Sequence, residues 1–309
     1  MTYYMNTPAG FAGFLKNSRV NQLFKGILDE YGRWLTTEES CSSIVKDIKG
    51  GWLSEEAMET MGGKKEFVKT FHCNPLEKHY GYKSFDDFFT RTLRPESRPL
   101  PKPDNGNIII NACENAPFRI EYYVSRYTTF WAKKMPYSLQ FILDNDPNIE
   151  KFVGGTVFQG FLSPHTYHRF HAPVSGRVVS SRVVEGTYFS HPYYMDGTGS
   201  YMTAQPYLGH VATRGIIIID TENPLIGLVA FVPIGMVDVS TVDLDLISGK
   251  ERVTKGDNIG TFHFGGSTHM LIFEKKCQLQ FDLQGIPLSE DGTEFLEVRT
   301  KLATAVPSA

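Results

Sequence analysis

The segment His263–Met270 (HFGGSTHM) contains the residues whose types and spacing point to the most specific chemistry in this sequence. Two glycines directly precede Ser267, and glycine adopts backbone conformations that are costly for other residues. An acyl shift from nitrogen to oxygen requires a strained Gly266–Ser267 peptide bond, because the serine hydroxyl must attack the carbonyl carbon of Gly266. The alternative interpretation is a Gly-Gly hairpin turn followed by a polar residue, which a short motif alone does not exclude.

A second segment, Phe161–Gly176 (FLSPHTYHRFHAPVSG), contains His165, His168 and His171. A single histidine is more often structural than catalytic, but three at intervals of three before a proline turn favour a functional group. A zinc site is disfavoured, because no further ligand group is evident and the H-x-x-H spacing lies in a loop and strand context. We therefore predict no metal, and a general base that acts beside a serine.

A third segment, Asn107–Ile120 (NIIINACENAPFRI), places Glu114 at the end of an apolar strand. An acidic residue at a strand end often only marks the solvent boundary. Together, however, the three segments supply an acid, a histidine and a serine in chain order. Such a set can orient an imidazole and activate a hydroxyl group.

The elements that must position these groups change in type along the chain. Apolar residues recur at helical spacing over Phe11–Leu35, and capping signals predict a helix at Ser54–Met61 and a short one over Ser84–Leu93. The apolar residues of the first helix (Phe11, Phe14, Leu15, Leu23, Phe24 and Leu28) suit either a core-facing helix, which we favour, or a helix lying on a membrane. A proline-rich connector, Glu96–Asn107, then separates a helical region from the rest of the chain.

Beyond this connector the sequence predicts strands. Short β-branched or aromatic runs are bounded by Gly, Pro, Asp or Asn: NIIINA, GTVFQGFL, GRVVSSRVV, GIIIID, LVAFVPIGMV and HMLIFE. The run VTKGDNIGTF resembles the turn of barrel-sandwich folds such as biotinyl and lipoyl domains. We predict an α+β fold, with a helical N-terminal layer (1–100) packed on a β-rich, barrel-sandwich-like core of antiparallel sheets (101–309).

Several of these motifs occur together, and in the same order, in a known family. From about residue 80 onward the chain resembles the phosphatidylserine decarboxylase family through the segments FFTRTLRPESRP, YHRFHAPVSG and VTKGDNIGTFHFGGST. The resemblance implies self-cleavage between Gly266 and Ser267 into a β chain, 1–266, and an α chain, 267–309. It also implies that Ser267 becomes a covalent pyruvoyl group, the only cofactor, whose ketone reacts with a substrate amine to drive decarboxylation.

The resemblance also implies roles for individual residues. His171 matches the triad histidine, and His168 matches the second active-site histidine, which acts during decarboxylation. Two positions depart from the common pattern, because Glu114 stands in place of an aspartate and Gly265 in place of a leucine. Both departures are similar to the fungal L-tryptophan decarboxylase branch of the family.

Composition restricts the substrate and the compartment. The net charge of −3 gives no sign of a nucleic-acid partner, and no basic-then-apolar signal peptide is present. The stretch Pro224–Val237 is too short to cross a bilayer. Four cysteines without a CxxC pair favour a reducing, cytoplasmic setting. We therefore predict a small-molecule amino acid substrate, L-tryptophan first, with phosphatidylserine as the alternative and membrane binding disfavoured; a homodimer is suggested by the family alone.

Two other classes of protein compete with the decarboxylase. A serine hydrolase is disfavoured because Ser267 does not lie in a G-x-S-x-G elbow. A non-catalytic binding module on the same fold would keep the Gly266–Ser267 bond intact. The aromatic-rich stretch Tyr188–His210 suits either a lid over a substrate ring or an ordinary irregular loop.

Overall fold

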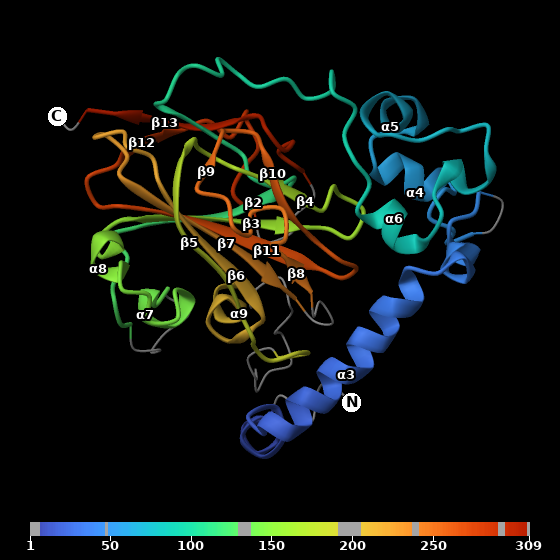
Figure 1. Cartoon of the computed structure of the whole chain (residues 1–309), viewed down its shortest axis with the longest axis horizontal. Coiled ribbons are helices and arrows are strands. Elements are labelled where there is room, and N and C mark those ends of the chain that lie inside the picture. The colour runs from blue at the N-terminus through green and yellow to red at the C-terminus, as the bar shows by residue number, and fades with distance from the viewer. Residues whose placement is uncertain are drawn as a thin grey trace.

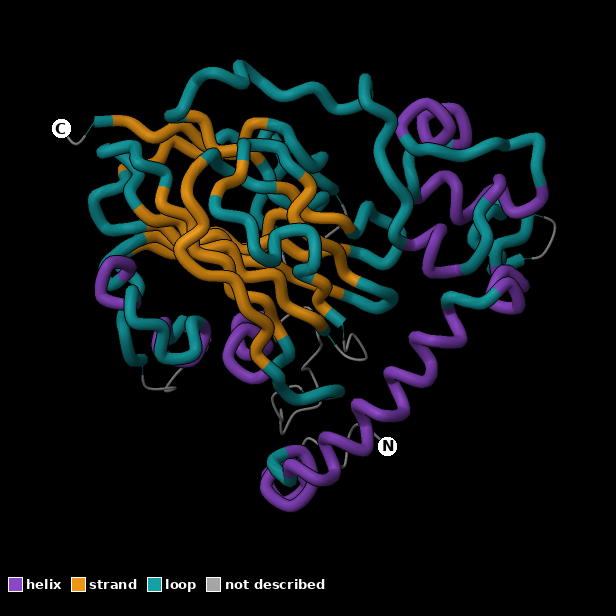
Figure 2. Tube along the Cα trace, in the orientation of Figure 1, coloured by secondary structure: helices purple, strands orange, loops and turns teal. Residues whose placement is uncertain are grey.

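The computed structural model describes residues 7–46, 49–128, 137–190, 205–236, 241–289 and 294–307. Its described part is an α+β fold, as predicted, with N-terminal helices beside a body of strands (Figure 1). The strands of the body run across one another in layers, and short helices cover one side of it (Figure 2). Every pair of named strands is antiparallel. The domain boundary near residue 100 stays a prediction.

The N-terminal helices begin where polar side chains cap them. The helix predicted over Phe11–Leu35 is divided, because α3 (Ser18–Leu35) begins after Asn17. The side chain of Asn17 caps this helix by accepting hydrogen bonds from the backbone N–H groups of Arg19 and Val20. Ser54 and Ser84 cap the next predicted helices in the same way. The helical segments around these caps are α2 (Pro8–Gly10), the π-helical η1 (Phe11–Leu15), η2 (Glu38–Ser43), α4 (Glu55–Thr60), α5 (Lys64–Thr70), η3 (Lys78–Gly81) and α6 (Phe85–Phe89).

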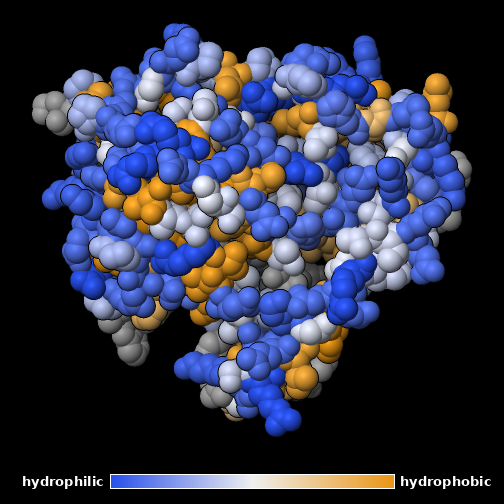
Figure 3. Space-filling view, in the orientation of Figure 1, coloured by the Kyte–Doolittle hydropathy of each residue, from blue (hydrophilic) through white to orange (hydrophobic). Residues whose placement is uncertain are grey.

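One face of α3 does not match the predicted core-facing pattern. Leu28 is buried, but Leu23 is 64% exposed and therefore does not face the core as expected. Leu23 lies with Ile27, Tyr31 and Trp34 on an outer stripe of the helix. In the space-filling view, apolar side chains reach the surface at the lower part of the molecule, in the region of α3 (Figure 3).

A seven-stranded sheet forms the body. Its order is β2-β3-β11-β7-β6-β5-β9, so β11 (Ser267–Phe273) pairs on both sides and every residue in it is buried. Two smaller sheets have the orders β1-β13-β12 and β4-β10-β8. The other strands are β1 (Ile108–Ile110), β2 (Ala116–Tyr122), β3 (Thr156–Leu162), β4 (Arg169–His171), β5 (Gly176–Val184), β6 (Arg214–Asp220), β7 (Leu228–Gly235), β8 (Val242–Asp243), β9 (Arg252–Val253), β10 (Asn258–Phe262), β12 (Gln278–Phe281) and β13 (Lys301–Val306).

Apolar clusters cover both faces of this sheet, which explains why its strands have continuous rather than alternating apolar sequences. Leu271 and Phe273 belong to a cluster shared with the smaller sheets. Met270 and Ile272 point the other way, into a cluster shared with the short helices α7 (Leu139–Ile142), α8 (Ile149–Phe152) and α9 (Gln205–Val211). Side chains of β11 therefore alternate between two layers, and Ser267 shares a face with Leu271.

A third cluster joins the N-terminal helices to the histidine segment. Arg91, just after α6, is buried, and its guanidinium lies 4.6 Å from the ring centre of Phe71. The same group donates hydrogen bonds to the carbonyls of His165 (2.8 Å) and Thr166 (3.0 Å). The arginine in the FFTR segment thus holds the loop that carries His165 and His168.

The turn in VTKGDNIGTF requires glycine. Gly256 has a φ of +90°, and a Cβ atom placed there would lie 2.7 Å from the side chain of Leu100. The turn therefore also contacts the connector that follows the helical layer. The carbonyl oxygen of Gly256 also lies within hydrogen-bond distance of His171.

Candidate active site

Ser267 begins β11, an interior strand of the main sheet, and is completely buried. It pairs with Leu162 of β3 and Gly235 of β7. Its hydroxyl oxygen is buried and has no hydrogen-bond partner. Since an unpaired buried polar group costs stability, such an orphan calls for a functional explanation. A hydroxyl that is free to react meets this requirement.

The backbone just before Ser267 has a glycine-specific conformation at Gly265 and a fixed hydrogen bond at Gly266. Gly265 has a φ of 139°, in the region that favours glycine. The carbonyl oxygen of Gly266 accepts a hydrogen bond from the backbone N–H of Met236, at 2.9 Å. A fixed N–H group at this oxygen would stabilise the negative charge that develops when the carbonyl carbon is attacked. Sequence reasoning missed this donor, because Met236 lies thirty positions upstream and reaches the site only through the pairing of β7 with β11.

His168 is fixed as a neutral base. Its Nδ1 atom donates to the Thr166 carbonyl (2.9 Å), so its Nε2 atom carries the lone pair, and that atom is buried without a partner. The ring stacks on Phe89 with centres 4.0 Å apart. Burial, helped by the charge of Arg91, lowers the pKa of His168 to about 3.

His171 is held at both ring nitrogens. Nδ1 donates to the carbonyl of Gly256 (2.8 Å), and Nε2 lies 3.0 Å from the hydroxyl of Tyr167. Burial raises the pKa of the Tyr167 phenol well above its ordinary value, so the phenol donates and Nε2 accepts. Burial also lowers the pKa of His171 to about 4. His171 is therefore neutral, and the lone pair that could take a proton from Ser267 is bound by Tyr167.

Glu114 forms an ion pair with Arg98 instead of a bond with His171. The two side chains are almost buried, at 14% and 10% exposure. The segment of Glu114 nevertheless adjoins the histidine strand, since the N–H of His171 donates to the carbonyl of Ala112 (2.8 Å). The structure thus places the three predicted segments together, but it does not link Glu114, His171 and Ser267 by direct hydrogen bonds.

A buried polar cluster lies next to the Gly266–Ser267 bond, on the helix-covered face of the sheet. The hydroxyl of Thr268 is 2.9 Å from the amide oxygen of Gln205 and 3.1 Å from the amide nitrogen of Gln159. Gln159 in turn accepts from the hydroxyl of Tyr137 (2.7 Å). These contacts fix the residue directly after Ser267. The glutamines were not predicted, because they meet Thr268 only across strands and a helix.

The described residues also show the state of the cysteines, of possible metal-binding clusters and of possible membrane-spanning helices. All four cysteines are free. The described residues contain no cluster that could hold a metal ion, and no described helix is long and apolar enough to cross a membrane. Most of the predicted lid, residues 191–204, and Val237 of the apolar stretch lie outside the described residues.

The buried histidines predict an acid-labile fold. Burial lowers the pKa of four of them from an ordinary value of 6.5 to about 3 or 4: His168, His171, His210 and His269. As pH falls below 6.5, the unfolded chain therefore binds protons that the folded chain does not, and stability is lost. We expect the free energy of unfolding to fall by up to about 1.4 kcal/mol per histidine for each pH unit between 6.5 and 4.

Urea titrations at pH 7, 6 and 5 measure this slope. Replacing His269, whose two ring nitrogens both lack partners, by Phe should reduce the slope by about one histidine's share. His263 acts in the opposite sense. Although burial lowers its pKa, Asp86 and Asp243 raise it overall, so its stabilising contribution is present at low pH and is lost as pH rises. A free energy that stays constant from pH 7 to 5 would contradict the prediction.

Comparison with known proteins identifies the class to which this fold and site belong. The family model for phosphatidylserine decarboxylase matches residues 85–285, and a second phosphatidylserine decarboxylase model matches residues 1–61. The chain therefore belongs to the phosphatidylserine decarboxylase family, as its motifs indicated. It is a decarboxylase, that is, a carboxy-lyase.

Individual relatives differ in the substrate that their names give. The chain is 38% identical to "Decarboxylase iboD" of Amanita muscaria over 91% of this chain and 84% of that protein. It is 35% identical to "L-tryptophan decarboxylase" of Psilocybe cubensis over 91% of this chain and 68% of that protein. It is 29% identical to "Phosphatidylserine decarboxylase proenzyme" of Chlamydia felis over 85% of this chain and 84% of that protein.

Proposed function

We propose that the protein is a pyruvoyl-dependent decarboxylase that cleaves itself between Gly266 and Ser267. The observation that carries this proposal is the buried, unpartnered hydroxyl of Ser267, two residues after Gly265, whose φ of 139° favours glycine. The site fits the group that would form, because β3 and β7 would continue to hold the strand that begins with it. Once formed, a pyruvoyl group supplies a ketone that withdraws electrons from a substrate amine during loss of CO₂.

Cleavage requires an acyl shift, an elimination and the proton transfers that accompany them. His171 accepts the Ser267 hydroxyl proton as the oxygen bonds to the Gly266 carbonyl carbon, whose oxygen receives the N–H of Met236. The C–N bond breaks, the nitrogen takes the proton, and an ester remains. Elimination then transfers the Cα hydrogen of residue 267 to a base as a proton, forms the Cα=Cβ bond of dehydroalanine, breaks the Cβ–O bond and releases residues 1–266 with a terminal carboxylate. Water converts the remaining dehydroalanine to the ketone, and ammonia leaves.

Two side chains must support His171 in this scheme. The Tyr167 hydroxyl has to give up Nε2 before the imidazole can take the serine proton. Glu114, which is paired with Arg98 in this structure, would reach the histidine only through Tyr167, whose phenol is affected by the Glu114 charge. His168, with a free lone pair, is the group that we assign to proton transfer during decarboxylation.

We propose L-tryptophan, or another aromatic amino acid, as the substrate, with phosphatidylserine as the second candidate. The names of the two Psilocybe relatives, each 35% identical to this chain, support the amino acid. Phosphatidylserine is favoured by the family models and by the more distant relatives. We also propose a cytoplasmic location, which suits a small-molecule amino acid substrate. A homodimer stays a prediction.

Intact-mass spectrometry followed by decarboxylation assays tests the proposal. We expect two chains. The mass of residues 267–309 should be lower by one ammonia than that of the same fragment beginning with serine, because the ketone oxygen replaces the hydroxyl oxygen and the oxygen count stays the same. We expect amine and CO₂ from L-tryptophan but not from phosphatidylserine vesicles. A single uncleaved and inactive chain would contradict the enzyme and favour a binding module. A cleaved chain that acts only on vesicles would overturn the amino acid substrate.

A further inference from the structure

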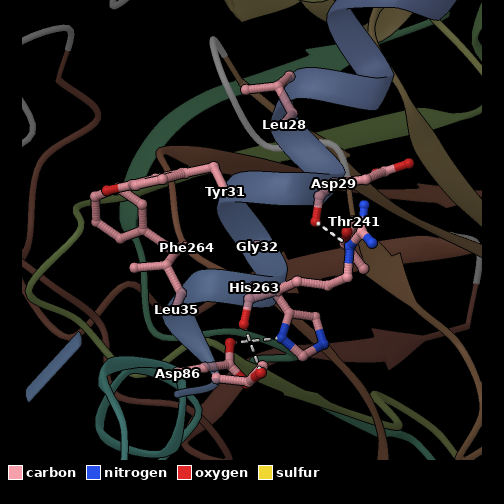
Figure 4. A pocket seen from close by; sticks show the side chains of 11 residues that line it. Leu28, Asp29, Tyr31, Gly32, Leu35, Asp86, Thr241, His263 and Phe264 are labelled. Atoms are coloured by element: carbon pink, nitrogen blue, oxygen red, sulfur yellow. Dashed lines mark hydrogen bonds and ion pairs between the residues drawn. The ribbon is translucent and has the colours of Figure 1, made fainter. Parts of the chain in front are cut away.

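A cavity of about 350 Å³ lies between α3 and the segment that leads to Ser267. Its volume is in the range of small-ligand sites. Helix α3 forms one wall with Leu28, Tyr31 and Gly32, and His263 and Phe264 face it (Figure 4). This cavity is absent from the site as the sequence predicted it, because its walls come from opposite ends of the chain.

Ring contacts connect the cavity to the active-site histidine. Phe264, three positions before Ser267, packs against Tyr31 with ring centres 6.3 Å apart and against Phe89 at 5.4 Å. Phe89 in turn stacks on His168 at 4.0 Å. A molecule in the cavity would thus contact the layer of rings that holds the catalytic imidazole. Aromatic walls of this kind favour an aromatic ligand.

The other end of the cavity is polar and charged. Asp86 accepts a hydrogen bond from Nδ1 of His263 at 2.7 Å, and Asp243 lies 3.7 Å from Nε2 of the same ring. Asp29, paired with Lys25, lies on the α3 side. Of these carboxylates, Asp29 and Asp86 line the cavity, together with Arg33 and His263. Charged groups of this kind accept or donate hydrogen bonds and do not suit an acyl chain.

We propose that this cavity receives the aromatic side chain of the substrate and that Asp86 selects a ring carrying a hydrogen-bond donor, such as an indole N–H. The inference rests on the proposed decarboxylase function and adds the specificity site to it. Helix α3 then has a role in substrate recognition, although it lies about 230 residues upstream of Ser267 and outside the main sheet. The chemistry at Ser267 and the choice of substrate are thereby assigned to different parts of the chain.

Gly32 permits a direct test of the cavity. It lines the cavity, and a Cβ atom added there would meet nothing within 4 Å. Gly32→Leu therefore places a side chain in the cavity from an unobstructed Cβ position, while leucine favours the helix more than glycine does. Gly26→Leu is the matched control, since Gly26 is on the same helix, is equally unobstructed and does not line the cavity.

We expect Gly32→Leu to raise KM for L-tryptophan at least about tenfold, with cleavage at Ser267 unchanged by intact mass. Gly26→Leu should keep KM within about twofold, the spread expected of a change that touches no substrate. If tryptophan is decarboxylated but the two variants have the same KM, the cavity is not the substrate site. If no form of the enzyme decarboxylates an amino acid, the proposed function fails instead, so the two failures are distinguishable.

The role of Asp86 is tested with a substrate that lacks the donor. In 3-benzothienylalanine, sulfur replaces the indole N–H with little change of shape. The wild type should prefer tryptophan by about tenfold or more in kcat/KM, the loss expected when a hydrogen-bonding site meets an analogue without the group. Asp86→Asn should reduce this preference, while cleavage continues. An equal preference in both enzymes would overturn the selection by Asp86.

Discussion

Ser267→Ala should leave the 309-residue chain in one piece and abolish decarboxylation. The hydroxyl is the group that attacks the Gly266 carbonyl from within the strand in the proposed scheme, and without it no ester and no ketone can form. We expect a single species of 34.8 kDa by intact mass, against two fragments for the wild type. Activity should fall below detection, because no other group in the proposed scheme supplies the electron-withdrawing ketone.

A folding defect can be separated from this result. The Ser267 hydroxyl has no hydrogen-bond partner, so its removal leaves no partner unsatisfied, and the uncleaved variant should fold and unfold in one cooperative transition. Ser180→Ala is the matched control, because the Ser180 hydroxyl on β5 is also buried without a partner. The control should cleave and decarboxylate normally. Cleavage of Ser267→Ala at the same bond would contradict the assignment of the nucleophile.

His168→Gln should still cleave itself but lose about 10²- to 10⁴-fold in kcat, the usual contribution of a positioned acid or base. The free Nε2 lone pair on a ring stacked against Phe89 is the feature that glutamine cannot replace. The pKa of about 3 keeps the ring neutral, so the wild-type kcat profile should show no ionisation of His168 between pH 5 and 8. Single-turnover assays on fully cleaved enzyme measure the effect.

His165→Gln provides the comparison within the same loop. His165 is only partly buried and stacks near Trp52 at 4.9 Å, away from the proposed proton transfer. We expect its kcat to stay within about threefold of the wild type, as for substitutions remote from chemistry. An uncleaved His168→Gln chain would place His168 in maturation, and an unchanged kcat would remove it from catalysis. Either outcome would contradict the proposed role of His168 in proton transfer.

Local signals accounted for much of the fold. Caps at Ser54 and Ser84 begin helices as predicted, and the β-branched runs became strands because short-range steric preferences and apolar patterning act within a few residues. The division of the first helix was missed, although Asn17 is itself a capping signal. The exposure of Leu23 was also missed, since the face of a helix that is covered depends on what packs against it.

The sequence by itself determined the family and singled out Ser267, His168, His171 and Glu114, because motif order and residue type are local properties. Only the tertiary structure decided the partners of these groups. It paired Glu114 with Arg98, placed Tyr167 on His171, and brought Met236 to the Gly266 carbonyl. The α3 cavity was likewise decided by packing, since contacts between residues hundreds of positions apart depend on how strands pair and layers stack, which no short segment encodes.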